Sequence, residues 1–484
     1  YKKYNLGPID AIAKTMVRVR GSYALELMFR DYPGEIWVAR KDSPMIIGIA
    51  DGETYVASDV PAILKYTRNV YYIGNLEFAK LTPGEAHFYD LNGDEIEKQT
   101  TEIKWDAEAA EKGGFEHFMM KEIHEQPKAV QDTLNSVIRN GAIDLSSVEI
   151  NEDEIKNFEQ IYIVACGSAY HVGVAAQYVI EELVQIPVRV ELASEFRYRR
   201  MLFAPNSLVI IVSQSGETAD SLAALREAKA HGVKTLAIVN VVGSTIAREA
   251  DHVFYTLAGP EIAVATTKAY STQLICMYLL SMYMAKVRGE IDDAARVRGM
   301  IDEDRAAELI AELQTIPDKI EKLLEDKERI QWFAAKQMNA QNMFFIGRGI
   351  DYAVSLEGSL KMKEISYLHA EAYAAGEMKH GPIALIDEGF PVVAIATKSP
   401  VYDKVVSNLQ ESRARGACII AVATEGDEEI AKPANHVIYV PKVRDAFSPI
   451  TASVPLQLLS RAVAVKRGCD VDQPRNLAKS VTVE

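Results

Sequence analysis

The sequence predicts an α/β fold with two tandem, doubly wound parallel sheets, preceded by an antiparallel β segment. From about residue 159, continuous apolar runs of strand length, such as Ile161–Ala165 and Leu208–Val212, alternate with helical segments. Such runs are typical of buried parallel strands. The alternation then recurs: Ala250–Tyr255 resembles Ala434–Tyr439 at an offset of 184 residues. Residues 1–105 differ, because they carry short strand-like segments separated by hairpin signals.

The first 105 residues are expected to form an antiparallel block after one short helix. Asp51-Gly52 and Asn92-Gly93 are dipeptides that favour tight hairpins. The expected strands are Ser22–Phe29, Glu35–Arg40, Met45–Ile49, Thr54–Ala57 and Phe88–Leu91. Residues 106–158 form a helical connector, in which Phe115–Ile123 and Val130–Val137 have the spacing of amphipathic helices and an acidic stretch follows.

The two α/β copies are expected over residues 159–295 and 343–470. Residues 296–342 are charged and helical, are interrupted at Pro317, and are interpreted as bridging helices. In the first copy the expected strands are Ile161–Ala165, Leu208–Val212, Thr235–Val239 and Val253–Tyr255, with a helix over Ala219–Ala230. Their counterparts in the second copy are Phe344–Ile346, Val392–Ala396, Cys418–Ala423 and Val437–Tyr439.

Composition and charge exclude several classes of protein. The 484 residues carry a formal net charge of −15, which argues against nucleic acid or an anionic membrane as partner. The apolar stretch Ile275–Ala285 is far shorter than the ~20 residues that a membrane-spanning helix needs. Four scattered cysteines suit neither a disulfide framework nor a zinc site, so a reducing cytoplasm is the simplest location.

A phosphate site is predicted where the second apolar strand ends. Ser213-Gln214-Ser215-Gly216-Glu217-Thr218 lies between a buried strand and a helix. A helix start offers free N–H groups and the positive end of the helix dipole, and open α/β sheets bind ligands at this edge. Three hydroxyls and one amide therefore suit a phosphate monoester. The sequence lacks a P-loop or a G-x-G-x-x-G pattern, so nucleotide binding is not indicated.

Acid–base chemistry is predicted on the first helix of the second copy. Glu357, Lys361 and Glu364 are spaced i, i+4 and i+7 within Ser355–Ile365, so they share one helix face. A carboxylate beside an ammonium group can move a carbon-bound proton, although a solvated salt-bridged stripe has the same pattern. His380 precedes Gly381-Pro382 and could protonate or deprotonate a sugar oxygen near neutral pH. Residues 471–484 form a tail with no helix pattern, to which sequence physics alone assigns no role.

At these residues the chain resembles the glutamine–fructose-6-phosphate aminotransferase (isomerizing), or glucosamine-6-phosphate synthase, family over essentially its whole length. The most specific matches are Ala193–Arg199, Ser213–Thr218, Leu356–Pro382 and Asp472–Glu484. The resemblance implies that the two copies are sugar-isomerase (SIS) domains. It also implies that residues 1–105 are part of an Ntn-type class II glutaminase domain and that residues 471–484 are an active-site tail.

The resemblance further implies roles for single residues. Glu364 is the base that moves a proton between C1 and C2, supported by Glu357 and Lys361. His380, from a partner subunit, opens the sugar ring. Lys479 forms a Schiff base with the open ketose, which requires a lowered pKa and hence a docked tail. Phosphate is held by Ser213, Gln214, Ser215 and Thr218, and the sugar is lined by Cys166, Gly167, Ser168, Ala169, Val264, Thr266 and Ala478.

The implied reaction turns fructose 6-phosphate into glucosamine 6-phosphate without a metal or organic cofactor. A completed site with His380 from a neighbour implies a homodimer. The family's glutaminase uses an N-terminal cysteine, whereas residue 1 is Tyr and no cysteine precedes Cys166. We therefore expect no glutamine hydrolysis unless an N-terminal glutaminase part is present. A sugar-phosphate isomerase or deglycase, or a non-catalytic sugar-phosphate sensor with SIS domains, remains an alternative.

Overall fold

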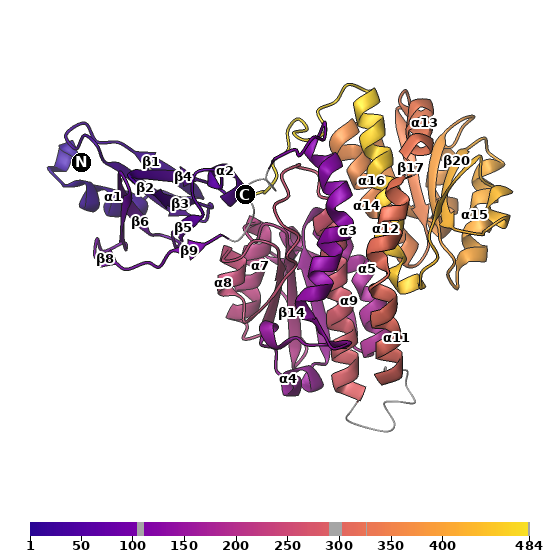
Figure 1. The fold of residues 1–484 in the computed structure, drawn as a ribbon, viewed down its shortest axis with the longest axis horizontal. Helices are drawn as coiled ribbons and strands as arrows, with labels where there is room; N and C mark the ends of the chain where they lie inside the picture. The colour runs from indigo at the N-terminus through magenta and orange to yellow at the C-terminus, as the bar shows by residue number, and fades with distance from the viewer. Residues whose placement is uncertain (104–110, 290–302, 326, 483–484) are drawn as a thin grey trace.

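The computed structural model describes residues 1–103, 111–289, 303–325 and 327–482. A β-rich N-terminal unit extends from one side of a larger body, in which two parallel sheets enclose a central group of helices (Figure 1). The expected boundaries at residues 105/106 and 295/296 lie outside the described residues.

The N-terminal unit has four layers: helix, sheet, sheet, helix. All its strand pairs are antiparallel, in a five-stranded sheet of order β1-β2-β6-β7-β8 and a four-stranded sheet of order β4-β3-β5-β9. Its elements are α1 Pro8–Met16, β1 Tyr23–Leu27, β2 Ile36–Lys41, β3 Ile46–Ala50, β4 Glu53–Ala57, α2 Val60–Ile63, β5 Asn69–Tyr72, β6 Phe78–Thr82, β7 Glu85–Tyr89, β8 Glu95–Ile96 and β9 Thr101–Glu102. Val38, Ile47, Ala79 and Phe88 are buried between the two sheets.

The two expected hairpins form, but with different turns. Residues Ala50 and Glu53 pair directly across Asp51-Gly52, as a two-residue turn requires. Across Asn92-Gly93 the closing pair is Tyr89 and Glu95, so the loop has five residues. The Asp90 carboxylate organises it by accepting hydrogen bonds from the N–H groups of Asn92 and Asp94.

The connector contains one long helix, α3 Phe118–Val137, where two helices were expected. Pro127 lies inside α3 and removes one hydrogen bond, yet Met119, Ile123, Val130 and Leu134 lie on one buried face that packs against helix α9. Burial of that face keeps the helix continuous. The connector continues with β10 Ile138–Arg139, β11 Ala142–Ile143 and α4 Glu152–Asn157.

The two parallel sheets have the same strand order, as a duplicated fold requires. The first has the order β13-β12-β14-β15-β16 and the second β18-β17-β19-β20-β21. The first copy contains β12 Gln160–Ala165, α5 Gly167–Val184, β13 Val188–Leu192, α6 Ala193–Phe196, β14 Ser207–Ser213, α7 Ala219–Ala230, β15 Lys234–Val239, α8 Thr245–Glu249, β16 His252–Tyr255 and α9 Lys268–Gly289. The second contains β17 Asn342–Gly347, α14 Ile350–Ser366, β18 His369–Ala374, β19 Pro391–Ala396, α15 Tyr402–Arg413, β20 Cys418–Thr424, β21 His436–Val440 and α16 Ser448–Lys466.

The bridging helices are α11 Glu303–Leu313, α12 Ile316–Glu325 and α13 Lys327–Gln337. The helical run is interrupted at Gln314-Thr315, just before the expected position, and Pro317 lies in the first turn of α12, where a missing N–H costs nothing. One hydrophobic core runs from α3 through α5, α9, α14 and α16 to both sheets. Within the described residues, no helix is long and apolar enough to cross a membrane.

Candidate active site

A cavity of about 250 Å³ opens where strands β12 and β14 of the first sheet end. It gathers segments that are far apart in the sequence: two strand-to-helix loops, the loop before α9, one face of α14, and the tail. Its lining includes the predicted residues Cys166, Gly167, Ser168, Ala169, Ser213, Gln214, Ser215, Thr218, Val264, Thr266, Lys361, Glu364, Ala478 and Lys479. Ser221, Gln273 and Leu477 also line it, although sequence reasoning did not single them out.

The loop after β14 is held in shape by its own hydroxyls. Ser213 Oγ lies 3.0 Å from Thr218 Oγ1 and accepts a hydrogen bond from Gly216 N–H at 3.0 Å. Ser215 Oγ accepts one from Glu217 N–H at 3.2 Å. Helix α7 begins directly after Thr218. The loop therefore presents hydroxyls and a helix start to the cavity, which suits an anion such as phosphate.

Gly216 lies in a left-handed backbone conformation that leaves no room for a side chain. Its φ is +65°, and an added Cβ would lie 2.0 Å from Ser244 Oγ and 2.5 Å from Ser244 Cβ. Gly216→Ala should therefore distort the loop, lower the unfolding free energy by about 1–3 kcal/mol and weaken binding of a phosphorylated sugar. Urea unfolding and calorimetric titration measure both effects.

Gly232→Ala is the matched control for this change. Gly232 has a similar φ of +70°, but an added Cβ would meet nothing within 4 Å. Gly232→Ala therefore introduces the same backbone strain without a steric clash, and residue 232 lies outside the cavity. Equal losses of sugar binding in the two variants would contradict a role for the Gly216 turn.

The charged face of α14 lies beside the cavity and is largely buried. The side chains of Glu357 and Lys361 are each 1% exposed, and that of Glu364 is 21% exposed. Lys361 Nζ lies 2.6 Å from Glu364 Oε2 and 3.4 Å from Glu357 Oε1. Lys361 and Glu364 line the cavity, whereas Glu357 does not line it and contacts Lys361.

Glu357, Lys361 and Glu364 form a buried charge row on α14, and their charges stabilise one another. Burial by itself would raise the pKa of Glu357, but the Lys361 ammonium and the hydrogen bond from His171 outweigh burial and lower it. Burial would lower the pKa of Lys361, but the charges of Glu357 and Glu364 outweigh burial and raise it. Glu357 and Lys361 therefore remain ionised although both are buried.

Helix α5 of the first copy supplies two further partners. Ser168 Oγ donates to Glu357 Oε1 at 2.9 Å, and His171 Nδ1 lies 2.8 Å from Glu357 Oε2. These contacts join the first copy to the helix that carries the predicted base. Sequence reasoning missed His171, because only the packing of α5 on α14 brings it to Glu357.

The described part of the tail, residues 471–482, is docked by contacts near its start and near residue 481. The Asp472 carboxylate accepts from the N–H groups of Phe118 and Met119, both at 2.9 Å, where α3 begins. Nearer the chain end, Ser480 Oγ lies 2.8 Å from Ser215 Oγ, and Ala219 N–H donates to the Val481 carbonyl at 3.0 Å. The tail therefore covers the cavity and contacts the start of α7.

Lys479 projects from this tail, and its Nζ lies 2.6 Å from Glu261 Oε2. Glu261 is buried in the loop between β16 and α9. Sequence reasoning missed Glu261; its position two residues before Ala263-Val264 was the available signal.

His380 does not line the cavity. It is an exposed residue at the end of a 3₁₀ turn, Ala375–His380, which follows β18 of the second sheet. Within its own chain it is therefore separate from Glu364 and Lys479.

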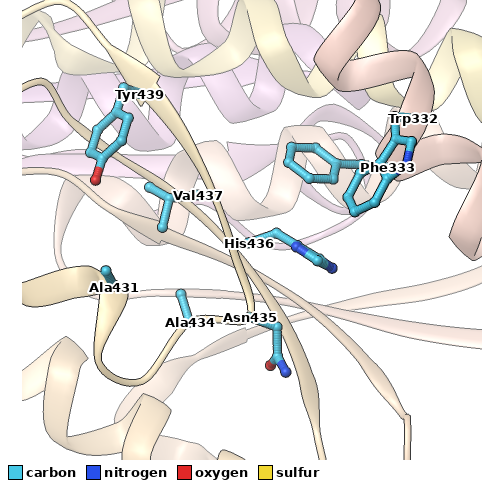
Figure 2. Close-up of a pocket in the computed structure, with 8 residues that line it drawn as sticks. All are labelled: Trp332, Phe333, Ala431, Ala434, Asn435, His436, Val437 and Tyr439. Atoms are coloured by element: carbon cyan, nitrogen blue, oxygen red, sulfur yellow. The ribbon is translucent and has the colours of Figure 1, made fainter.

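A second hollow, of about 530 Å³, lies at the outer edge of the second sheet and holds none of the predicted residues. Figure 2 shows His436 on β21 directed toward Phe333 and Trp332 of α13.

Among the residues that the structure describes, no group of three or more His, Cys, Asp or Glu side chains could hold a metal ion.

The corresponding position of the second copy is occupied by the protein itself. After β19, Thr397 donates to the Asp351 carboxylate through its N–H at 3.0 Å and its hydroxyl at 2.7 Å. Burial raises the pKa of Asp351 to about 7, despite these bonds. An internal carboxyl group thus binds the residue that follows β19, the counterpart of β14 in the first copy.

Known proteins share these features. The SIS domain family matches residues 154–283 and 338–467. Glutamine–fructose-6-phosphate aminotransferases (isomerizing) from Clostridium acetobutylicum and Thermus thermophilus are 52% and 45% identical, each over 98% of this chain and 77% of the relative. The C-terminal domain of the aminotransferase from Francisella tularensis is 38% identical, with a TM-score of 0.70, covering 75% of this chain and 100% of that domain.

A more distant solved structure shares the fold alone. Glucosamine-6-phosphate deaminase from Thermotoga maritima is 23% identical with a TM-score of 0.57, over 75% of this chain and 99% of the deaminase. The high identity over almost the whole chain, together with the two SIS domains, leads to one conclusion: the chain belongs to the glutamine–fructose-6-phosphate aminotransferase (isomerizing) family.

Proposed function

We propose that the chain converts fructose 6-phosphate and ammonia into glucosamine 6-phosphate and water. The proposal rests on one observation above all: the docked tail holds Lys479 at the same cavity as Glu364 and the Ser213–Thr218 loop. A nucleophile, a base and an anion site are the three parts that this reaction needs. The relatives at about 50% identity are aminotransferases of this kind, which supports the same activity.

In the proposed mechanism, the Ser213–Thr218 loop binds the phosphate and so fixes the sugar against α14. The Lys479 amine attacks the C2 carbonyl of the open ketose and forms an imine with loss of water. Ammonia then replaces the lysine. Glu364 removes a proton from C1 and returns it to C2, while Lys361 and Glu357 hold Glu364 in place.

We propose that a second copy of the chain completes the site. His380 is exposed and outside its own cavity, so it is available to a neighbouring subunit as the ring-opening group. The homodimer and this role of His380 rest on the family resemblance.

The domain organisation proposed from the sequence is retained: residues 1–105, 106–158, 159–295, 296–342, 343–470 and 471–484. The helix–sheet–sheet–helix layers of residues 1–103 support their assignment to a glutaminase-type segment. Glutamine is proposed as a partner only where the remainder of that domain is present.

The test supplies the chain with fructose 6-phosphate and an ammonium salt and measures glucosamine 6-phosphate. Product that requires ammonium supports the proposal. Glucose 6-phosphate formed equally without ammonium would instead support an isomerase, and tight binding without any product would support a sensor. A parallel reaction with glutamine reports whether the chain can release ammonia itself.

Glu364→Gln should slow this reaction by about 10²- to 10⁴-fold, because the amide cannot accept the C1 proton. Sugar binding should change little, since the phosphate loop is intact. Glu371→Gln is a control on the neighbouring strand β18, outside the cavity lining. Solvent deuterium incorporation at C2 of the product follows the proton transfer directly, and undiminished incorporation in Glu364→Gln would assign the base elsewhere.

A further inference from the structure

Glu261 is the residue that fixes the amine of Lys479. Its carboxylate is fully buried and makes four contacts. Oε1 accepts hydrogen bonds from the N–H groups of Thr267 and Ala269, at 2.9 and 3.1 Å, where α9 begins. Oε2 accepts from Thr266 Oγ1 at 3.2 Å and lies 2.6 Å from Lys479 Nζ. Three contacts to its own loop and helix hold the carboxylate rigidly, so its position determines where Nζ lies.

The pair lies in the wall between two cavities. Lys479 lines both the sugar cavity and an adjoining cavity of about 270 Å³ on the side of the N-terminal unit, which is distinct from the hollow beside Trp332. Glu261 lines only this adjoining, second cavity. In the described arrangement the ammonium is therefore held back toward Glu261. To attack a carbonyl in the sugar cavity, Nζ must leave this carboxylate and give up a proton.

A second carboxyl group lies close to Glu261. Glu122 of α3 is buried, and its Oε1 accepts from the N–H groups of Ile262 and Ala263, at 2.5 and 3.1 Å. Its Oε2 has no hydrogen-bond partner among the described residues. Burial and the charge of Glu261 raise the pKa of Glu122 to about 8, whereas Lys479 and the helix N–H groups outweigh burial and lower the pKa of Glu261. One negative charge, that of Glu261, therefore faces Lys479 at neutral pH.

Other charges face the pair from three sides. They are Lys268 of α9 with its partner Glu125 of α3, Lys361 and Glu364 of α14, and Arg40 and Glu217 across the second cavity. Lys268 is bound to Glu125 at 2.7 Å and Lys361 to Glu364 at 2.6 Å. Within the described part of the chain, none of these groups contacts Lys479 Nζ, whereas Glu261 does at 2.6 Å.

We propose that Glu261 is a positioning residue for the lysine chemistry: its buried carboxylate holds the Lys479 ammonium at the cavity wall until the sugar enters. The inference rests on the proposed function, because it assigns Glu261 a part in imine formation by Lys479. The balance of that step is simple: a lysine ammonium and a ketone give a protonated imine and water. Two hydrogens leave Nζ, and both depart with the carbonyl oxygen as water.

The test traps the imine. The chain is incubated with fructose 6-phosphate and borohydride across a pH series, and the sugar adduct on Lys479 is quantified by mass spectrometry. Glu261→Gln removes the charge and keeps the shape, so the amine should become reactive at lower pH. Loss of an opposite charge at contact distance should move the midpoint of the trapping profile about 1–3 pH units downward. A merely structural role would reduce the yield at every pH and leave the midpoint in place.

Glu122→Gln is the matched control. It makes the same carboxyl-to-amide change in a buried residue of the same cluster that does not contact Lys479, and below about pH 8 it replaces a neutral group. Its midpoint should move by clearly less than that of Glu261→Gln, because Glu122 acts on Lys479 through space and without a contact. If Glu261→Gln does not fold, Glu261→Asp carries the test, because its carboxylate lies one methylene farther from Nζ and should shift the midpoint by a smaller amount in the same direction.

The outcomes separate the two proposals. If the unmodified chain forms no adduct on Lys479, the proposed function fails. If the unmodified chain forms the adduct but the folded Glu261 variant keeps the same midpoint, the role of Glu261 is overturned and the proposed function stands.

Discussion

Replacing Lys479 by alanine is expected to reduce formation of glucosamine 6-phosphate by about 1,000-fold or more. The change removes the amine that forms the imine, and no other lysine is available in the tail, since Lys479 is its one lysine. Binding of the phosphosugar should change only a few-fold, because the hydroxyls of Ser213, Ser215 and Thr218 are untouched. Product formation with ammonium and calorimetric binding of fructose 6-phosphate measure the two effects.

Arg475→Ala separates the amine from the docking of the tail. The Arg475 guanidinium lies 4.3 Å from the centre of the Tyr367 ring, and Arg475 N–H donates to the Tyr367 hydroxyl at 2.8 Å. Arg475→Ala removes the guanidinium contact, retains the backbone hydrogen bond and Lys479, and so loosens the tail only in part, so activity should fall by far less. Substantial turnover by Lys479→Ala would remove the lysine from the mechanism. Binding without turnover in the unmodified chain would identify a sensor.

The interior of each parallel sheet could be predicted from the sequence, because its strands are continuous apolar runs. Helix α7 begins and ends at the residues expected, Ala219 and Ala230. The edge strands β13 and β18 were missed, because they are half exposed and their sequences, Val188–Leu192 and His369–Ala374, mix polar and apolar residues. The opposite edge strands, β16 and β21, were predicted because more of their residues are buried and apolar.

The site residues also fall into those that a local sequence pattern predicts and those that it does not. The Ser213–Thr218 loop and the stripe of α14 are local patterns, so strand–turn–helix logic and helical spacing were sufficient to predict them. Lys479 required the family resemblance, because nothing in a polar tail predicts that it docks. His171 and Glu261 are brought to their partners only by tertiary packing, and their contacts with Glu357 and Lys479 span 186 and 218 residues of sequence. No sequence spacing encodes a contact of that kind.

Breaking the buried charge row should cause the largest loss of stability. Glu357→Leu leaves Lys361 with one carboxylate in place of two and leaves Ser168 and His171 without their acceptor. Removing one partner of a buried pair typically costs about 3–5 kcal/mol. Urea unfolding should show this loss. Glu364→Gln, at a more exposed position, should cost about 1 kcal/mol or less, because the contact between Lys361 and Glu357 persists.

The pH dependence of stability in a second variant at this position, Glu357→Gln, tests the electrostatic cause. The pKa of Glu357 is lower in the folded chain than in the unfolded chain, whose value is about 4.3. Its stabilisation is therefore fully present above about pH 4.3 and is lost as the pH falls through the lower folded value. The difference in unfolding free energy between the unmodified chain and Glu357→Gln should accordingly narrow as the pH falls below about 4.3. A difference that stays constant down to pH 3 would mean that packing, and not the charge of Glu357, stabilises this helix.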